Sequence, residues 1–195
     1  MKKVLIVRYG AMGDHLHASH LPRLLKEKAG YDWVSVESNF KGLPIYQDNP
    51  YIDYLNIIET SVPILVNYPV SFWEKRAMYL KKEGKFDLLI WLRNSIEHGY
   101  IAMEDMAEYF LSTAERRALY GGHNYYDQTT IFAGFPQFVG MKGEIYFTEE
   151  QEKVVQEIYR REYQNKFVII CNLSGTSKHK LFYNAEYIVK SFLGN

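Results

Sequence analysis

Asp14 has the setting of a chemically active residue, because it follows an apolar run and a glycine loop. The segment VLIVRYGAMGD spans residues 4–14. Its continuous apolar stretch is typical of a parallel strand covered by helices on both faces. Gly10 and Gly13 allow a sharp turn and the close approach of a ligand. From spacing alone, the carboxylate of Asp14 either caps the following helix or acts as general base toward a bound hydroxyl group.

Three histidines, His15, His17 and His20, follow at once and suggest a metal site. On one continuous helix, however, only His17 and His20 share a face, since they are three residues apart. No carboxylate or cysteine stands beside them at ligand spacing. We therefore interpret the three as polar or partly buried helix positions and expect no metal site.

Two other loops carry polar residues in positions where ligands bind. Arg93 and Asn94 follow an apolar run at 86–92, at the carboxyl end of a predicted strand, where open α/β sheets hold their ligands. Lys178 and Lys180 follow a loop of small residues and are suited to neutralise a phosphate. Both groups are equally explained as solvated loop residues.

Strand and helix patterns alternate along the chain, which predicts an α/β fold with a parallel sheet and right-handed crossovers. The predicted strands after the first are 32–37, 52–58, 86–92 and 167–171, with a short one at 116–121. The predicted helices are 16–29, 73–82, 101–110, 126–135, 149–163 and 184–193, with a surface helix or loop at 40–46. Pro22 either kinks the first helix or marks a restart.

The last strand and helix repeat the opening in outline and indicate the start of a second sheet. We expect a first domain over residues 1–164 and an incomplete second domain over 165–195. A dinucleotide-binding loop is an alternative interpretation of Gly10 to Gly13, with Glu37 placed to hold a ribose. Arg8 argues against it, because it occupies the position of the first glycine in that motif. A nicotinamide-dependent oxidoreductase therefore stays the weaker alternative.

Charge and composition exclude several classes of function. Lys plus Arg and Asp plus Glu both number 23, so the chain lacks the basic field of proteins that bind nucleic acid. The first apolar stretch is too short for a signal peptide, and no run reaches the length of a membrane span. Cys171, the single cysteine, is interpreted as buried filler and indicates a reducing compartment. We expect a soluble, cytoplasmic protein.

Three stretches together resemble a known family, the lipopolysaccharide heptosyltransferases of glycosyltransferase family nine. They are residues 4–17, the Asp-Asn-Pro-Tyr-Ile-Asp turn at 48–53, and the loop at 172–182. The resemblance implies the N-terminal half of a GT-B fold, a Rossmann-like parallel sheet flanked by helices, followed by the first strand and helix of a second Rossmann-like domain. It also implies inverting, metal-independent transfer of a heptose-like sugar from a nucleotide-sugar substrate, without a cofactor.

The resemblance further assigns roles to individual residues. Asp14 would be the general base that takes a proton from the acceptor hydroxyl. The donor phosphates would lie against Ser177, Lys178 and Lys180, and the acceptor side would comprise Gly10, Met12, Gly13, Arg93 and Asn94.

The partners implied are a nucleotide-sugar donor and a glycan or glycolipid acceptor, with no nucleic acid and at most peripheral membrane contact. Because the donor half is short, we expect the 195-residue chain to transfer sugar poorly or not at all on its own. The alternative from another class is a non-catalytic sugar-binding or assembly domain with the same fold.

Overall fold

The computed structural model describes residues 1–58, 70–92, 111–112, 114–115, 118, 122–168 and 184–193. The chain divides into two compact units, Met1–Thr148 and Glu149–Asn195. The first unit holds the sheet. The predicted domain boundary after residue 164 stays a prediction.

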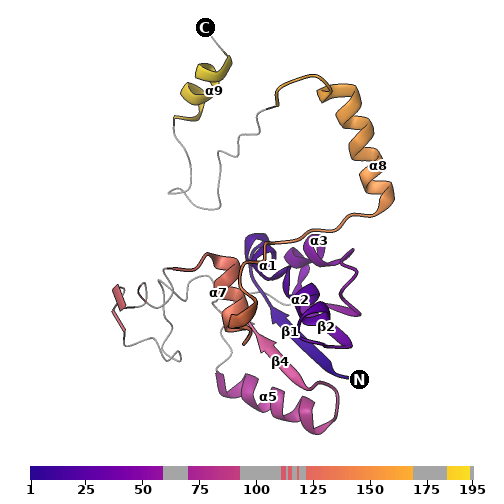
Figure 1. Cartoon of the computed structure of the whole chain (residues 1–195), viewed down its shortest axis with the longest axis vertical. Coiled ribbons are helices and arrows are strands. Elements are labelled where there is room, and N and C mark those ends of the chain that lie inside the picture. Colours follow the sequence, from indigo (N-terminus) through magenta and orange to yellow (C-terminus); the bar gives the residue numbers. More distant parts are fainter. Residues whose placement is uncertain are drawn as a thin grey trace. The chain divides into compact units, whose positions relative to one another are not determined.

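A four-stranded parallel sheet forms the centre of the first unit, in the order β3-β2-β1-β4 (Figure 1). The chain builds from β1 toward one edge and then crosses to the other side of β1 to form β4. β1 therefore lies inside the sheet, with Ile6 in register with Val36 on one side and Ile90 on the other. The strands are β1 (Lys3–Arg8), β2 (Trp33–Asn39), β3 (Tyr54–Ile58) and β4 (Leu88–Trp91).

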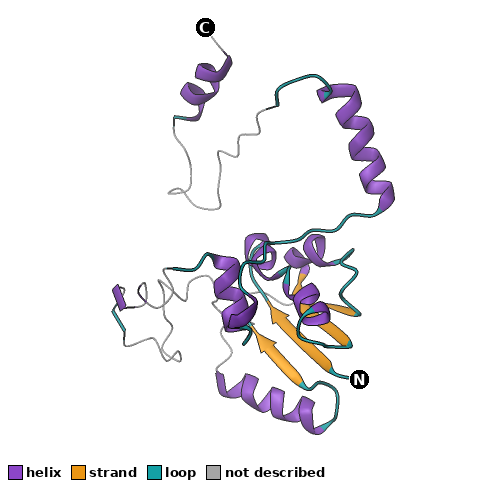
Figure 2. Cartoon of the chain, in the orientation of Figure 1, coloured by secondary structure: helices purple, strands orange, loops and turns teal. Residues whose placement is uncertain are grey.

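Helices cover both faces of β1, as its continuous apolar run predicts (Figure 2). Val4 and Ile6 belong to a core cluster that includes Leu21 and Leu24, whereas Leu5 and Val7 pack in a second cluster on the opposite face. Among the described residues of this unit, the helical elements are α1 (Met12–Ala18), α2 (Leu21–Glu27), η1 (Phe40–Gly42), α3 (Leu43–Tyr46), α5 (Val70–Lys82), α7 (Tyr125–Phe132) and η4 (Pro136–Phe138).

The predicted helix over 16–29 is two helices, and Pro22 marks the restart. Proline stands second in α2, where its missing N–H has no partner to lose. Ser19 and His20 separate α1 from α2. Of the two outcomes expected at Pro22, a kink or a restart, the restart is confirmed.

The segment 40–46 is less superficial than its sequence indicates. Phe40 and Leu43 are exposed, but Ile45 and Tyr46 are buried. The hydroxyl of Tyr46 donates to the carbonyl of His15 at 3.2 Å, so this short helix is anchored to α1. The prediction of a surface helix or loop was therefore wrong for the second half of the segment.

The described residues of the second unit are mainly helical. α8 (Glu149–Ile158) continues as a π-helical turn over Tyr159–Tyr163, and α9 spans Ala185–Leu193, so both predicted helices are confirmed. Phe167 and Val168, the described part of the predicted strand at 167–171, are not in a strand. The predicted helix at 101–110 and the strand at 116–121, apart from Ala118, lie outside the described residues, as does Cys171. Within the described parts of the chain, no helix has the length and apolarity to cross a membrane.

Candidate active site

The candidate site lies at the carboxyl ends of β1 and β4. The chain leaves β1 toward β2 and returns on the other side as β4, so the crossover directions diverge between these two strands. In open α/β sheets, a point of this kind leaves a crevice in which ligands bind. Arg8 ends β1 here, and the loop from Tyr9 to Ala11 leads into α1.

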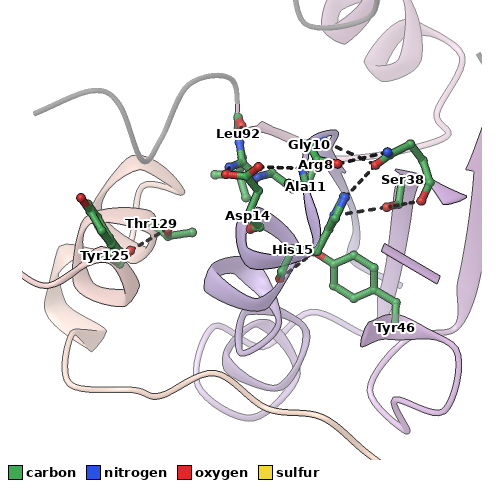
Figure 3. A network of polar contacts seen from close by, with 11 residues as sticks. Arg8, Gly10, Ala11, Asp14, His15, Ser38, Tyr46, Leu92, Tyr125 and Thr129 are labelled. Carbon is green, nitrogen blue, oxygen red and sulfur yellow. Dashed lines mark hydrogen bonds and ion pairs between the residues drawn. The ribbon is translucent and has the colours of Figure 1, made fainter. Parts of the chain in front are cut away.

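Asp14 is the third residue of α1, and both of its carboxylate oxygens have a defined partner (Figure 3). Oδ2 accepts a hydrogen bond from the backbone N–H of Ala11 at 2.7 Å, and Oδ1 lies 2.9 Å from Nη2 of Arg8. The side chain is 20% exposed, so it still meets solvent. The carboxylate thus stabilises the first turn of the helix from within and is held at the mouth of the loop.

The buried side chain of Arg8 holds Asp14 in place. Its side chain is 3% exposed, and its Nε donates to the backbone carbonyl of Asp14 at 3.3 Å. Its Nη1 donates to the carbonyl of Leu92, the residue after β4. One buried guanidinium therefore connects the ends of β1 and β4 to the start of α1, which no pattern in the sequence predicts.

The two glycines of the loop have different surroundings. Gly10 has a φ of 156°, and a Cβ built on it would lie 2.5 Å from Oδ2 of Asp14. Gly13 has no atom within 4 Å of the equivalent position, so its face is open. Met12 precedes it and is 55% exposed. Close packing thus requires glycine at position 10, whereas Gly13 leaves backbone accessible beside Asp14.

Two polar residues that the sequence did not single out stand behind the loop, at the end of β2. Asn39 donates from Nδ2 to the carbonyl of Gly10 at 3.1 Å and receives a long bond from its N–H at 3.4 Å. Ser38 lies beside it, with Oγ 3.3 Å from Nδ1 of His15. The available signal was their position, because polar residues at the carboxyl end of a strand were the reason for selecting Arg93 and Asn94.

Each of the three histidines contacts other side chains, and His15 and His17 lie on α1 whereas His20 lies between α1 and α2. Nε2 of His15 contacts Oδ1 of Asn39 at 2.7 Å, and Nε2 of His20 contacts Oγ1 of Thr130 at 2.7 Å. Burial lowers the pKa of His15 and of His20 to about 4, so both are neutral near pH 7.

His17 packs against the rings of Tyr125 and Tyr126, with centroids 5.2 and 5.1 Å away, and burial lowers its pKa as well. His20 also contacts the ring of Tyr126, although it lies beyond the end of α1. In the described part of the chain, no three His, Cys, Asp or Glu side chains are grouped as a metal site would require.

The carboxylate of Glu37 is hydrogen-bonded to other side chains. Its Oε2 lies 2.8 Å from Nη2 of Arg76 and accepts from Asn56 at 3.3 Å, while Oε1 accepts from the hydroxyl of Tyr9. With its side chain 7% exposed, this carboxylate has little surface to offer a ribose. The arrangement argues against the dinucleotide interpretation.

The structure therefore brings together Gly10, Met12, Gly13 and Asp14 among the residues selected from the sequence. Arg93 and Asn94 lie outside the described residues, directly after Leu92. Ser177, Lys178 and Lys180 also lie outside them, and their proposed contact with donor phosphates stays a prediction.

Comparison with known proteins finds a likeness to solved structures. No family model matches the chain, and no curated protein matches it. Among solved structures, it is similar to the crystal structure of the glycosyl transferase family 9 from Veillonella parvula DSM 2008, with a TM-score of 0.50 and 17% sequence identity. The likeness is one of fold.

That alignment covers 82% of this chain and 49% of the Veillonella chain, so the present sequence spans about half the length of its structural relative. Together with the sheet order, the match supports a partial Rossmann-like α/β architecture of the GT-B kind. At this identity, the activity of the relative is not transferred to this chain by the comparison alone.

Proposed function

We propose that this chain is the acceptor-side half of an inverting, metal-independent glycosyltransferase that uses a nucleotide-sugar donor. The observation that carries the proposal is the position of the Asp14 carboxylate, which is partly exposed at the point where the crossover directions diverge and is held there by Arg8. The fold shared with a family nine glycosyl transferase supports it. The finer expectation is a heptose-like sugar and a glycan or lipopolysaccharide-type acceptor.

In this mechanism, Asp14 is the general base. As the acceptor hydroxyl oxygen attacks the anomeric carbon of the donor, its proton passes to the carboxylate of Asp14. The bond between that carbon and the diphosphate oxygen breaks on the opposite face, which inverts the anomeric configuration. The electron pair leaves with the nucleoside diphosphate, whose growing negative charge Lys178 and Lys180 would offset together with Ser177.

The contacts of Asp14 fit this role. Each carboxylate oxygen offers about two acceptor positions, and among the described residues each has one hydrogen-bond partner, Ala11 or Arg8. Within that part of the chain, one position on each oxygen is left for a substrate hydroxyl. Because Arg8 is buried, the carboxylate keeps its direction when a substrate arrives, so little reorganisation accompanies the proton transfer.

The second candidate is a sugar-binding or assembly domain without catalysis. The observation in its favour is that Asp14 already has a structural task, since Oδ2 accepts the N–H of Ala11 at the start of α1. A cap of this type contributes about 1 kcal/mol and needs no substrate to explain it. In that case, the site binds a glycan and leaves nucleotide sugars intact.

The proposal is tested by incubating the purified chain with a panel of nucleotide sugars and lipopolysaccharide-type glycans and measuring nucleoside diphosphate release. We expect slow release that depends on the glycan, continues in EDTA, and gives a product whose anomeric configuration, read by NMR, is opposite to that of the donor. Glycan binding without any release supports the second candidate. Retention of configuration contradicts the single-displacement mechanism.

A further inference from the structure

Asn39 and His15, which the mechanism above does not use, hold the backbone of Gly10 in place. Asn39 contacts both polar groups of Gly10, donating to its carbonyl at 3.1 Å and accepting from its N–H at 3.4 Å. Because Nδ2 is directed to the carbonyl, Oδ1 is the atom that faces His15. Oδ1 can only accept, so the Nε2 of His15, 2.7 Å away, carries the proton in this contact.

His15 is itself held on several sides. Its ring meets the ring of Tyr46 edge to face, with centroids 5.7 Å apart, and its Nδ1 lies 3.3 Å from Oγ of Ser38. A Cβ added at Gly42 would lie 2.8 Å from the same Nδ1, so η1 packs against the ring without space to spare. The ring is fully buried, and Figure 3 shows it between Ser38 and Tyr46.

The Gly10 peptide in turn limits where Asp14 can lie. The carboxylate of Asp14 occupies the space beside Gly10 that a Cβ would fill, and it accepts from the N–H of the next residue, Ala11. A rotation of the peptide between Gly10 and Ala11 would redirect that N–H and release Oδ2. The orientation of the carboxylate therefore depends on this peptide as well as on Arg8.

We propose that His15 is a positioning residue for Asp14, acting through Asn39 on the Gly10 peptide. The catalytic significance of this role rests on the proposed function, whereas the arrangement of the loop can be measured without any substrate. His15 directly follows Asp14 on α1, so the same helical turn supplies the carboxylate and the ring that fixes the loop in front of it. Burial lowers the pKa of His15 to about 4, so the ring is neutral near pH 7 and carries a single N–H, which the contact with Asn39 places on Nε2.

His20 offers a matched control within the same chain. It is also fully buried, also has a pKa of about 4, and also makes one contact through Nε2, but its partner is Thr130 of α7 rather than the loop. Replacing either ring removes a similar volume and the buried hydrogen bond of Nε2, and replacing His15 also removes the contact of Nδ1 with Ser38. Any difference between the two variants at the loop therefore reports the connection through Asn39 rather than a general loss of packing.

The experiment measures native-state amide exchange at Ala11 by NMR, with Val7 in the central strand as the reporter of global opening. We expect His15→Leu to accelerate exchange at Ala11 about tenfold or more relative to Val7. His15→Gln, which retains a donor near the position of Nε2, should restore the ratio, and His20→Leu should leave it unchanged. If His15→Leu does not fold, Asn39→Ser tests the same connection and should give the same increase.

The proposal is overturned if the ratio of Ala11 to Val7 exchange is unchanged in His15→Leu, or if His20→Leu raises it equally. It is also overturned if Asn39→Ser leaves Ala11 protected. None of these outcomes depends on finding a sugar substrate, so a failure of this proposal is distinguishable from a failure of the proposed transferase activity.

Discussion

Nη2 of Arg8 lies 2.9 Å from Oδ1 of Asp14, and the two residues close the turn between the central strand and the first helix. The guanidinium is almost fully buried, while the carboxylate still meets solvent. A buried cation without its partner is costly, and this favours the same arrangement in every folded molecule.

Arg8→Lys should lower the free energy of unfolding by about 2–4 kcal/mol, because one ammonium cannot reach the three acceptors that the guanidinium contacts. Urea unfolding with an unchanged m-value measures the effect. Arg23→Lys is the control, since Arg23 is 34% exposed in its pair with Glu144 and should cost under about 1 kcal/mol. Equal costs for the two variants would contradict the structural role given to Arg8.

The two loop glycines should respond in opposite directions to alanine. Gly10→Ala places a Cβ 2.5 Å from Oδ2 of Asp14 and should destabilise the chain by about 1–3 kcal/mol. Gly13 is the second residue of α1, and a methyl group added there meets open space. Gly13→Ala should therefore raise the free energy of unfolding by up to about 1 kcal/mol. Thermal unfolding of both variants checks this. A stabilised Gly10→Ala variant would show that the loop is not packed as described.

Acid should destabilise the first unit through His15 and His20. Their pKa is about 4 in the folded state against an ordinary histidine value of 6.5, so between these pH values the unfolded chain binds more protons. Stability is fully present above about pH 6.5 and falls by about 1.4 kcal/mol per pH unit for each histidine as the pH drops toward 4. Urea midpoints from pH 7 to 4 measure this. His20→Gln should reduce the slope, and a slope unchanged in that variant would contradict the assignment.

The features of this site that the sequence predicts are those formed by residues close together in the chain. The central strand, the glycine loop and the position of Asp14 follow from the order of residues 4–14, because a buried strand and a turn are set mainly by neighbours in the chain. The pair between Arg8 and Asp14 was missed. Arg8 was interpreted only as an obstacle to a dinucleotide loop, whereas its side chain lies under the loop and supports it.

Features that depend on tertiary contacts were the ones predicted incorrectly or not at all. A kink or a restart at Pro22 was expected, but no local pattern predicts that His20, just before it, contacts Thr130, which is distant in sequence. Tyr46 was placed at the surface because its neighbours include proline and glycine, yet its hydroxyl is buried against α1. The hydrogen bond from Asn39 to the carbonyl of Gly10 depends on the pairing of β2 with β1, which the local sequence pattern does not reveal.

Lys180→Ala should weaken binding of nucleoside diphosphates by about tenfold or more, because a lost charge-assisted contact to phosphate costs about 1.5–3 kcal/mol. Calorimetric titration of the whole chain measures the affinity. Lys153→Ala, on the exposed surface of α8, is the control and should bind as the wild type does. Equal affinities in all three proteins would remove Lys180 from the proposed donor site.

The most direct measurement of the central claim compares nucleoside diphosphate release by the wild type, Asp14→Asn and Asp53→Asn. Asp53 is a matched carboxylate at the other end of the sheet, since Oδ2 accepts the N–H of Val34 at 2.6 Å and lies 2.7 Å from Nζ of Lys26. Both substitutions retain an acceptor oxygen and remove the negative charge.

If Asp14 is the general base, Asp14→Asn should lower the rate by about a hundredfold or more while Asp53→Asn retains the wild-type rate. Equal rates in the wild type and Asp14→Asn would contradict the account and leave Asp14 as a helix cap.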